Sequence, residues 1–241
     1  LFRSLFIPQC NELAETMPAV FEKVGSAMEL LLPQGLLREG SVIQCMVADI
    51  PEDDWGEGVE IVGWMYHYYV SERKREVFDG YQKGRKAERD DIPAATQTFT
   101  PEWIVKYKVE NSLGRLWMFN HPNSHLVESM RYFIAPDPDA HENFKRITSP
   151  EEITVCDPAC GSGHILVYAF DLLALMYQEA GYVKRDIPRL ILEKNLSGME
   201  IDPRAAALAS FALTMKACEF DSRFLRRGAT PDVFVLDPVE I

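Results

Sequence analysis

Two acidic side chains and a pair of glycines are of the types that bind a nucleotide-like ligand. Asp157 opens the run DPACGSGH, which ends at His164 and contains Gly161 and Gly163. Glycine lets a ligand approach the backbone closely, and the free N–H groups at the start of a helix attract anionic groups. Glu200 ends a later apolar run, where a carboxylate can accept both hydroxyls of a ribose. These residues predict a small-molecule pocket at the carboxyl ends of two strands.

The segments around these residues have the pattern of alternating strands and helices. Residues 153–156 are short, apolar and β-branched, and residues 165–176 then carry apolar side chains at helical spacing. A second strand is predicted over 196–200, an alanine-rich helix over 204–218, and a third strand over 233–236. Strand, helix, strand, helix, strand is the order of an α/β protein, so we expect a parallel sheet with right-handed crossovers.

The glycine run favours one class of ligand over another. A dinucleotide-binding loop would read GxGxxG, but Leu166 occupies the place of the third glycine and Asp157 opens the turn. A carboxylate beside the loop disfavours a pyrophosphate and favours a cationic ligand, since opposite charges stabilise each other. S-adenosylmethionine carries both an amino group and a sulfonium, and it is the cofactor we expect.

The first part of the chain has a different character. Apolar residues recur at three- and four-residue steps over 1–37, which predicts helices with one buried face. Residues 59–70 (VEIVGWMYHYYV) predict an aromatic-rich helix, for which core packing is favoured over a base-stacking platform. The charged stretch 71–91 is typical of a solvated face or linker, and a phosphate-contacting role is the alternative. Further on, Thr100 is suited to cap a helix whose first residue is Pro101.

Composition excludes several classes of protein. The 241 residues include 25 Lys and Arg against 37 Asp and Glu, a net charge of −12, so any nucleic-acid contact should come mainly from outside this chain. No apolar run reaches the roughly 18–20 residues of a membrane helix. Five scattered cysteines predict neither a disulfide framework nor a metal site and favour a reducing, cytoplasmic location. The chain begins with Leu1 and shows no signal peptide, which predicts that it is a fragment.

Three strings together carry a specific resemblance. They are TFTPEWIV (98–105), DPACGSGHIL (157–166) and GMEIDPRA (198–205), in that order. They resemble adenine-specific (N6) DNA methyltransferases, and the order is similar to that in the group containing type I restriction modification subunits. The longer strings at 92–117 and 207–217 are most similar to the large methyltransferases of BREX (PglX-type) phage-defence systems. The likeness runs from about residue 59 to residue 237.

The resemblance implies a fold and a set of site residues. It implies the first half of a Rossmann-like class I methyltransferase sheet over residues 91–241, binding S-adenosylmethionine, preceded by a mainly helical region over 1–90. Phe99, Thr100 and Pro101 match the segment that closes over the methionine end of the cofactor. Asp157, Ala159 and Gly161 match the glycine loop. Glu200 matches the ribose-binding acid, Ile201 the apolar residue on the adenine, and Asp237 the acid that accepts the adenine amino group.

The resemblance also shows what this stretch does not contain. The family holds its target adenine with an Asn/Asp-Pro-Pro-aromatic tetrapeptide, and no such string occurs among the 241 residues. We therefore predict no catalytic residue here, expect the fragment alone to be inactive, and expect double-stranded DNA to be bound mainly by other parts. Other phage-defence proteins are possible partners. Two alternatives stay open: a methyltransferase acting on protein or RNA, and a non-catalytic scaffold that binds DNA or a partner within a defence complex.

Overall fold

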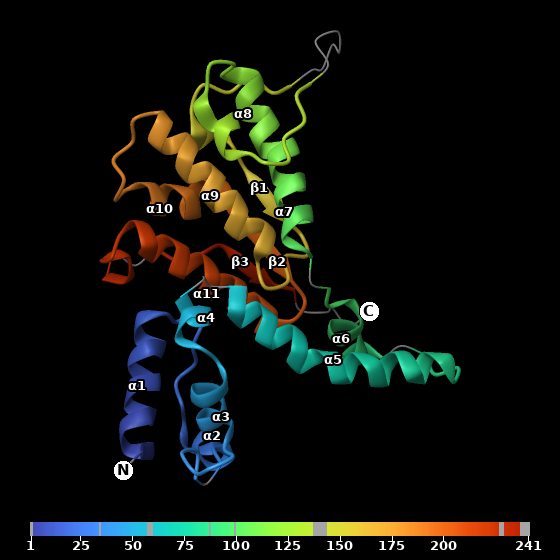
Figure 1. Ribbon diagram of the computed structural model, residues 1–241. Helices are drawn as coiled ribbons and strands as arrows, with labels where there is room; N and C mark the ends of the chain where they lie inside the picture. The colour runs from blue at the N-terminus through green and yellow to red at the C-terminus, as the bar shows by residue number, and fades with distance from the viewer. Residues whose placement is uncertain are drawn as a thin grey trace.

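The computed structural model is a mixed α/β structure that consists mostly of helices around a small parallel sheet (Figure 1). It describes residues 2–33, 35–56, 60–86, 88–98, 100–136, 144–226 and 229–236. Two of the predicted site residues, Phe99 and Asp237, lie outside these ranges. None of the helices in the described part of the chain combines the length and apolarity that crossing a bilayer requires.

The sheet confirms the predicted strands and their parallel pairing. Within the described residues its strands follow the order β1, β2, β3, and both neighbouring pairs are parallel. Their bounds are Val155–Asp157, Leu196–Glu200 and Val233–Val235. Each strand begins or ends within two residues of its predicted position. Asp157 pairs with Gly198, and Glu200 with Val235, so both acids stand at carboxyl ends on the same edge of the sheet.

Two long helices provide a large share of the core against this sheet. α9 follows β1 and α11 follows β2, and the two helices also pack on each other. Phe170, Leu173 and Tyr177 of α9 are fully buried, and Leu213 of α11 is 1% exposed. The helices from residue 102 onward are α7 (Glu102–Val109), α8 (Arg115–Asn120), α9 (His164–Glu179), α10 (Ile187–Leu190) and α11 (Pro203–Phe220).

Short 3-10 and π-helical segments lie between the longer elements. The 3-10 turns are η1 (Arg89–Asp91), η3 (His125–Ser129), η4 (Pro150–Glu152) and η6 (Phe224–Arg226), and the π turns are η2 (Glu110–Gly114) and η5 (Ile191–Asn195). The cap prediction at α7 was one residue early. Pro101 is the residue before the helix, the helix begins at Glu102, and the Thr100 side chain lines a cavity instead.

The N-terminal helices confirm the predicted helical character and part of the predicted burial, since Ala14 and Met17 are buried. They are α1 (Phe2–Thr16), α2 (Ser26–Leu31), α3 (Val42–Asp49), α4 (Glu52–Gly56), α5 (Glu60–Gln82) and α6 (Ile92–Thr96). Leu30 and Leu31 are 85% and 82% exposed, and no residue of α3, all of which is described, is buried. Apolar periodicity shows that a face can be buried, but here α9, α10 and α11 already fill the core, and α2 and α3 lie far from it (Figure 1).

The charged stretch 71–91 is largely a solvated face, one of the two predicted readings, and it is not a linker. Its first half continues α5, which runs from the centre of the molecule outward (Figure 1). Val77 in this half is fully buried. At the other end, the fully buried Asp91 carboxylate accepts from Arg73 at 3.1 Å and from Arg85 at 2.6 Å. The charges of this stretch therefore fold it back on itself, because a buried carboxylate needs such partners.

Candidate functional site

The Glu200 carboxylate links the end of β2 to the glycine loop. Its Oε2 atom accepts a hydrogen bond from the Gly161 N–H at 2.7 Å. Its Oε1 atom accepts from the N–H groups of Ile201 and Asp202 at 2.9 and 3.1 Å. Glu200 is only 8% exposed, so these backbone donors satisfy a carboxylate that burial would otherwise penalise. Two predicted site residues far apart in sequence are thus brought into contact.

The two glycines of the loop serve different purposes. Both have positive φ, 55° at Gly161 and 88° at Gly163, a region that L side chains rarely adopt. A Cβ at Gly163 would lie 2.9 Å from the Cβ of Ala209, so this glycine permits close packing of the loop on α11. A Cβ at Gly161 would have no described atom within 4 Å. The loop therefore packs tightly at Gly163 and leaves space beside Gly161.

Sequence reasoning missed a third glycine that shapes the same region. A Cβ at Gly198, in the middle of β2, would lie 2.9 Å from Leu166 and 3.1 Å from the Cys160 sulfur. The glycine lets the start of α9 and the loop approach the strand. A glycine inside a predicted strand is itself the signal of such a close approach.

Asp157 stands beside this loop at the end of β1. Its Oδ1 atom accepts from the Ala159 N–H at 3.2 Å, which closes a tight turn at the start of the loop. Burial raises the pKa of the Asp157 carboxyl above its usual value, an effect that this hydrogen bond and Lys108 partly offset. The charge of Glu200 adds to the increase. Two carboxylates therefore converge on one loop, an arrangement that favours a cationic ligand.

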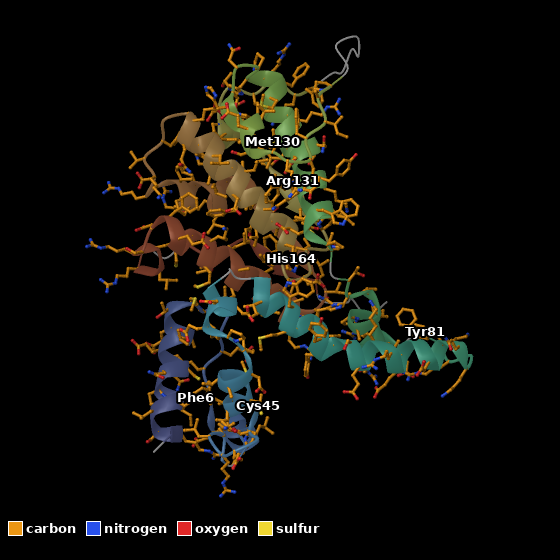
Figure 2. The ribbon with its side chains drawn as sticks, viewed as in Figure 1. Phe6, Cys45, Tyr81, Met130, Arg131 and His164 are labelled. Atoms are coloured by element: carbon orange, nitrogen blue, oxygen red, sulfur yellow. The ribbon has the colours of Figure 1, made fainter. Side chains whose placement is uncertain are left out.

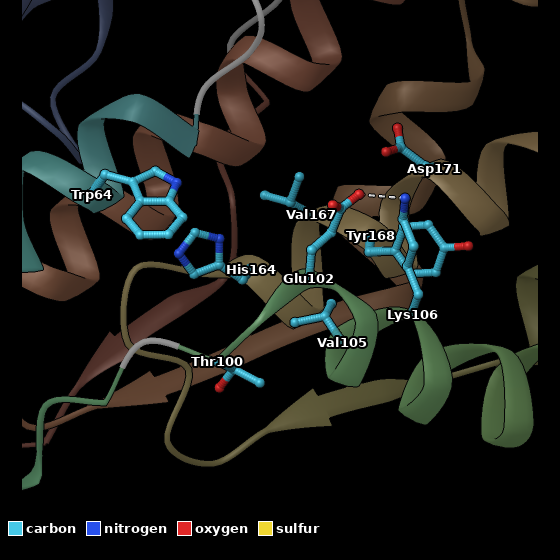
Figure 3. A pocket seen from close by; sticks show the side chains of 9 residues that line it. All are labelled: Trp64, Thr100, Glu102, Val105, Lys106, His164, Val167, Tyr168 and Asp171. Atoms are coloured by element: carbon cyan, nitrogen blue, oxygen red, sulfur yellow. Dashed lines mark ion pairs between the residues drawn. The ribbon is translucent and has the colours of Figure 1, made fainter. Parts of the chain in front are cut away.

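Thr100 lines a cavity of about 260 Å³ at the start of α9 (Figure 3). Trp64 of α5 and His164 of α9 face each other at one end of it, and Lys106 pairs with Glu102 at the other. Burial lowers the pKa of the His164 imidazole below its usual value, which favours the neutral ring. The segment before α7 thus lies beside the first residue after the glycine loop.

The predicted site residues are therefore placed as follows. Asp157, Ala159, Gly161 and Glu200 gather around the loop, and Ile201, 41% exposed, follows directly after Glu200. Thr100 and Pro101 precede α7, and Thr100 lines the same cavity as His164. Phe99 and Asp237 are outside the described residues.

Sequence reasoning also missed the contribution of α5. The Tyr66 hydroxyl donates to the Asp202 carboxylate, across 136 residues of sequence, and both side chains are buried. Trp64, two residues earlier, lines the cavity of Figure 3. Both belong to the aromatic run for which core packing was predicted. That prediction is correct for Tyr66 and Val70, but Tyr68 and Tyr69 are about 70% exposed.

Comparison with known proteins gives consistent names. Residues 139–237 match the family model described as MmeI, DNA-methyltransferase domain. The chain is 47% identical over 243 residues to the adenine-specific methyltransferase BrxX of Escherichia coli O9:H4 (strain HS), covering 98% of this chain and 20% of that protein. It is 41% identical over 249 residues to the adenine-specific methyltransferase PglX of Lacticaseibacillus casei (strain Zhang), covering 95% and 20%. These matches confirm the predicted resemblance, and the chain spans about a fifth of the length of these relatives.

A solved structure also matches part of the chain. It is that of the type IIL restriction-modification enzyme MmeI in complex with DNA, at 21% identity and a TM-score of 0.28. The match covers 56% of this chain and 17% of that one.

Proposed function

We propose that this chain, similar along nearly its whole length to relatives named adenine-specific methyltransferases, is the cofactor-binding part of a DNA adenine-N6 methyltransferase. The observation that carries the proposal is the junction of the Glu200 carboxylate with the Gly161 N–H, beside a second carboxylate at Asp157. The parallel strands in the order β1, β2, β3 are consistent with the first half of a Rossmann-like class I sheet over residues 91–241, with residues 1–90 as a helical region before it.

The residues around the loop suit S-adenosylmethionine. The open space beside Gly161 lets a ligand lie against the backbone, and the nearby acids suit its positive charges. Glu200 would accept from the ribose hydroxyls, and Ile201 offers an exposed apolar side chain to the adenine. Asp157 and Ala159 would line the loop side. Phe99, Thr100 and Pro101 would cover the methionine end, and Asp237 would accept from the adenine amino group.

The cofactor, when bound, supplies a methyl group on a sulfonium that an amine can take directly. This chain's residues would then act by binding and orientation, and none of them needs to be a nucleophile. The groups that hold the target adenine would belong to a tetrapeptide that these 241 residues lack. The acidic balance likewise assigns most DNA contacts to other parts of the protein. A role in phage defence and a cytoplasmic location complete the proposal.

Calorimetric titration of the full-length protein tests the cofactor assignment. Asp157→Asn retains an Oδ1 acceptor for the Ala159 N–H but removes the charge. We expect the variant to lose about 1.5–3 kcal/mol of affinity for S-adenosylmethionine, as for a hydrogen bond to a charged group. The loss for uncharged adenosine should be smaller. Equal affinities for the intact cofactor would show that Asp157 only closes the turn, and equal losses for both ligands would indicate a distorted loop.

Transfer of labelled methyl groups tests the reaction. The full-length protein should label N6 of adenine in duplex DNA, and residues 1–241 alone should not. Cofactor binding without transfer to any substrate would favour the scaffold alternative. Labelling of protein or RNA in place of DNA would favour the other methyltransferase class.

A further inference from the structure

We infer that helix α5, from the N-terminal helical region, positions the cofactor site, and that Tyr66 is the positioning residue through which it orients Glu200. The inference rests on the proposed function for the identity of the ligand. Neither the sequence motifs nor the names of the relatives indicate that the N-terminal helices help to position the cofactor site. Three segments that are distant in sequence contact α5: the turn after β2, the glycine loop, and the segment before α7.

The first contact fixes the turn that carries Glu200. The Tyr66 hydroxyl donates to Oδ2 of Asp202, and the two residues are 8% and 2% exposed. The other oxygen, Oδ1, accepts from the Arg204 N–H at 3.0 Å and so caps α11. The Asp202 N–H donates to Glu200 at 3.1 Å. Two hydrogen bonds, one to the side chain and one from the backbone of Asp202, therefore link α5 to the carboxylate that is proposed to bind the ribose.

The second contact is between the α5 backbone and the glycine loop. A Cβ at Gly63 would lie 3.1 Å from the Ser162 hydroxyl oxygen and 3.1 Å from His164 Nε2. The absence of a side chain at this position is what allows α5 to cross the loop so closely. Figure 2 shows His164 at this junction, where the start of α9 meets α5. Trp64, the next residue, faces His164 at one end of the cavity of Figure 3.

The third contact holds the segment that leads into Thr100. The Lys74 ammonium donates to the Gln97 carbonyl at 2.6 Å. Between this contact and the first, Tyr66 and Val70 pack in one buried cluster with Ala94 of α6 and Ala205 of α11. One helix thus sets the relative positions of all three segments proposed to surround the cofactor. A change in α5 should therefore alter cofactor affinity even though Tyr66 itself need not touch the ligand.

Tyr66→Phe in the full-length protein tests the inference, because it removes only the hydroxyl. We expect S-adenosylmethionine affinity to fall at least about 5-fold, and adenosine affinity by a similar factor, since both ligands carry the ribose. Tyr177→Phe is the matched control. Its hydroxyl donates to Asn195 at 2.8 Å in the core, away from the loop, so it should lower thermal stability and leave affinity unchanged. Tyr69→Phe, at a 71% exposed position, should change neither quantity.

A pair of glycine substitutions on α5 tests the loop contact. Gly63→Ala places a methyl group against the loop and should weaken cofactor binding several-fold, although alanine is the better helix former. At Gly80, on the same helix, the nearest described atoms to a Cβ belong to the flexible Arg85 side chain at 3.3 Å. Gly80→Ala should therefore bind the cofactor as the wild type does. If α5 has a purely structural role, neither Gly63→Ala nor Gly80→Ala should lower the affinity for S-adenosylmethionine.

The outcomes separate this inference from the proposed function. If the wild type binds the cofactor, and Tyr66→Phe loses stability like Tyr177→Phe but binds with wild-type affinity, the inference is overturned and the proposed function stands. If the wild type binds no S-adenosylmethionine, the proposed cofactor is wrong. Hydrogen exchange of the ligand-free protein then decides the positioning claim. Tyr66→Phe must speed exchange at Gly161 and over 200–204, and unchanged exchange there refutes it.

Discussion

The hydrogen bonds of Glu200 make Glu200→Gln the most informative single substitution. The carboxylate accepts one backbone N–H at Oε2 and two at Oε1. Glutamine has nearly the same shape, but its NH2 group must replace one of these oxygens and then faces a donor. If the NH2 group faces Gly161, one hydrogen bond is lost. If it faces the N–H groups of Ile201 and Asp202, two are lost.

The expected effect follows from the charge of the acceptor. A hydrogen bond to a charged group contributes about 1.5–3 kcal/mol, so cofactor affinity should fall about 10- to 150-fold if Glu200 accepts from the ribose. Titration calorimetry with S-adenosylmethionine measures this loss. Thermal unfolding of the ligand-free variant separately measures the cost of the lost backbone bonds. Titration with 2′,3′-dideoxyadenosine, which lacks the 2′- and 3′-hydroxyls, provides the second side of a double-mutant cycle with adenosine.

Two results would refute this reasoning. Wild-type affinity in Glu200→Gln would remove Glu200 from the cofactor site. An equal loss of affinity for adenosine and for the dideoxy ligand would show that the substitution distorts the loop and does not remove a ribose contact.

Further predictions concern the loop, a thiol and an acid. Gly163→Ala should lower the free energy of unfolding by about 2 kcal/mol or more, and Gly181→Ala by about 1 kcal/mol. Both glycines have positive φ, but only Gly163 lacks room for a Cβ. Equal losses in urea unfolding would contradict this reasoning. Burial raises the pKa of the Cys160 thiol to about 12, so iodoacetamide at pH 8 should label the exposed Cys156 before Cys160. Peptide mapping that finds the reverse order would contradict this burial. Burial alone would raise the pKa of Glu179, but the three hydrogen bonds that its carboxylate accepts lower this pKa below its usual value. The contribution of Glu179 to stability is therefore present above the unfolded-state pKa and is lost as pH falls through the lower folded-state pKa. Glu179→Gln should therefore flatten the acid side of a plot of melting temperature against pH, and an unchanged slope would show that this group does not contribute.

The sequence alone determined the strands, the glycine loop and the placement of two acids. These features are local: strands and helices carry different apolar periods, and glycine marks the turn between them. The sequence predicts a pocket at the carboxyl ends of two strands, which carry Asp157 and Glu200, and the structure places both acids at the loop. The names of the relatives confirm the resemblance that these motifs carried.

Tertiary structure decided which distant groups meet and which apolar faces are covered. The partner of the Tyr66 hydroxyl lies 136 residues away, and nothing in the local pattern of an aromatic run specifies it. The same holds for the charged stretch after it, in which the fully buried Asp91 carboxylate pairs with the partly exposed Arg73 and Arg85. Helices α2 and α3 have the apolar residues of core helices and yet stay exposed. Periodicity states what a segment is able to bury, and only the folded chain determines whether a surface is available to receive it.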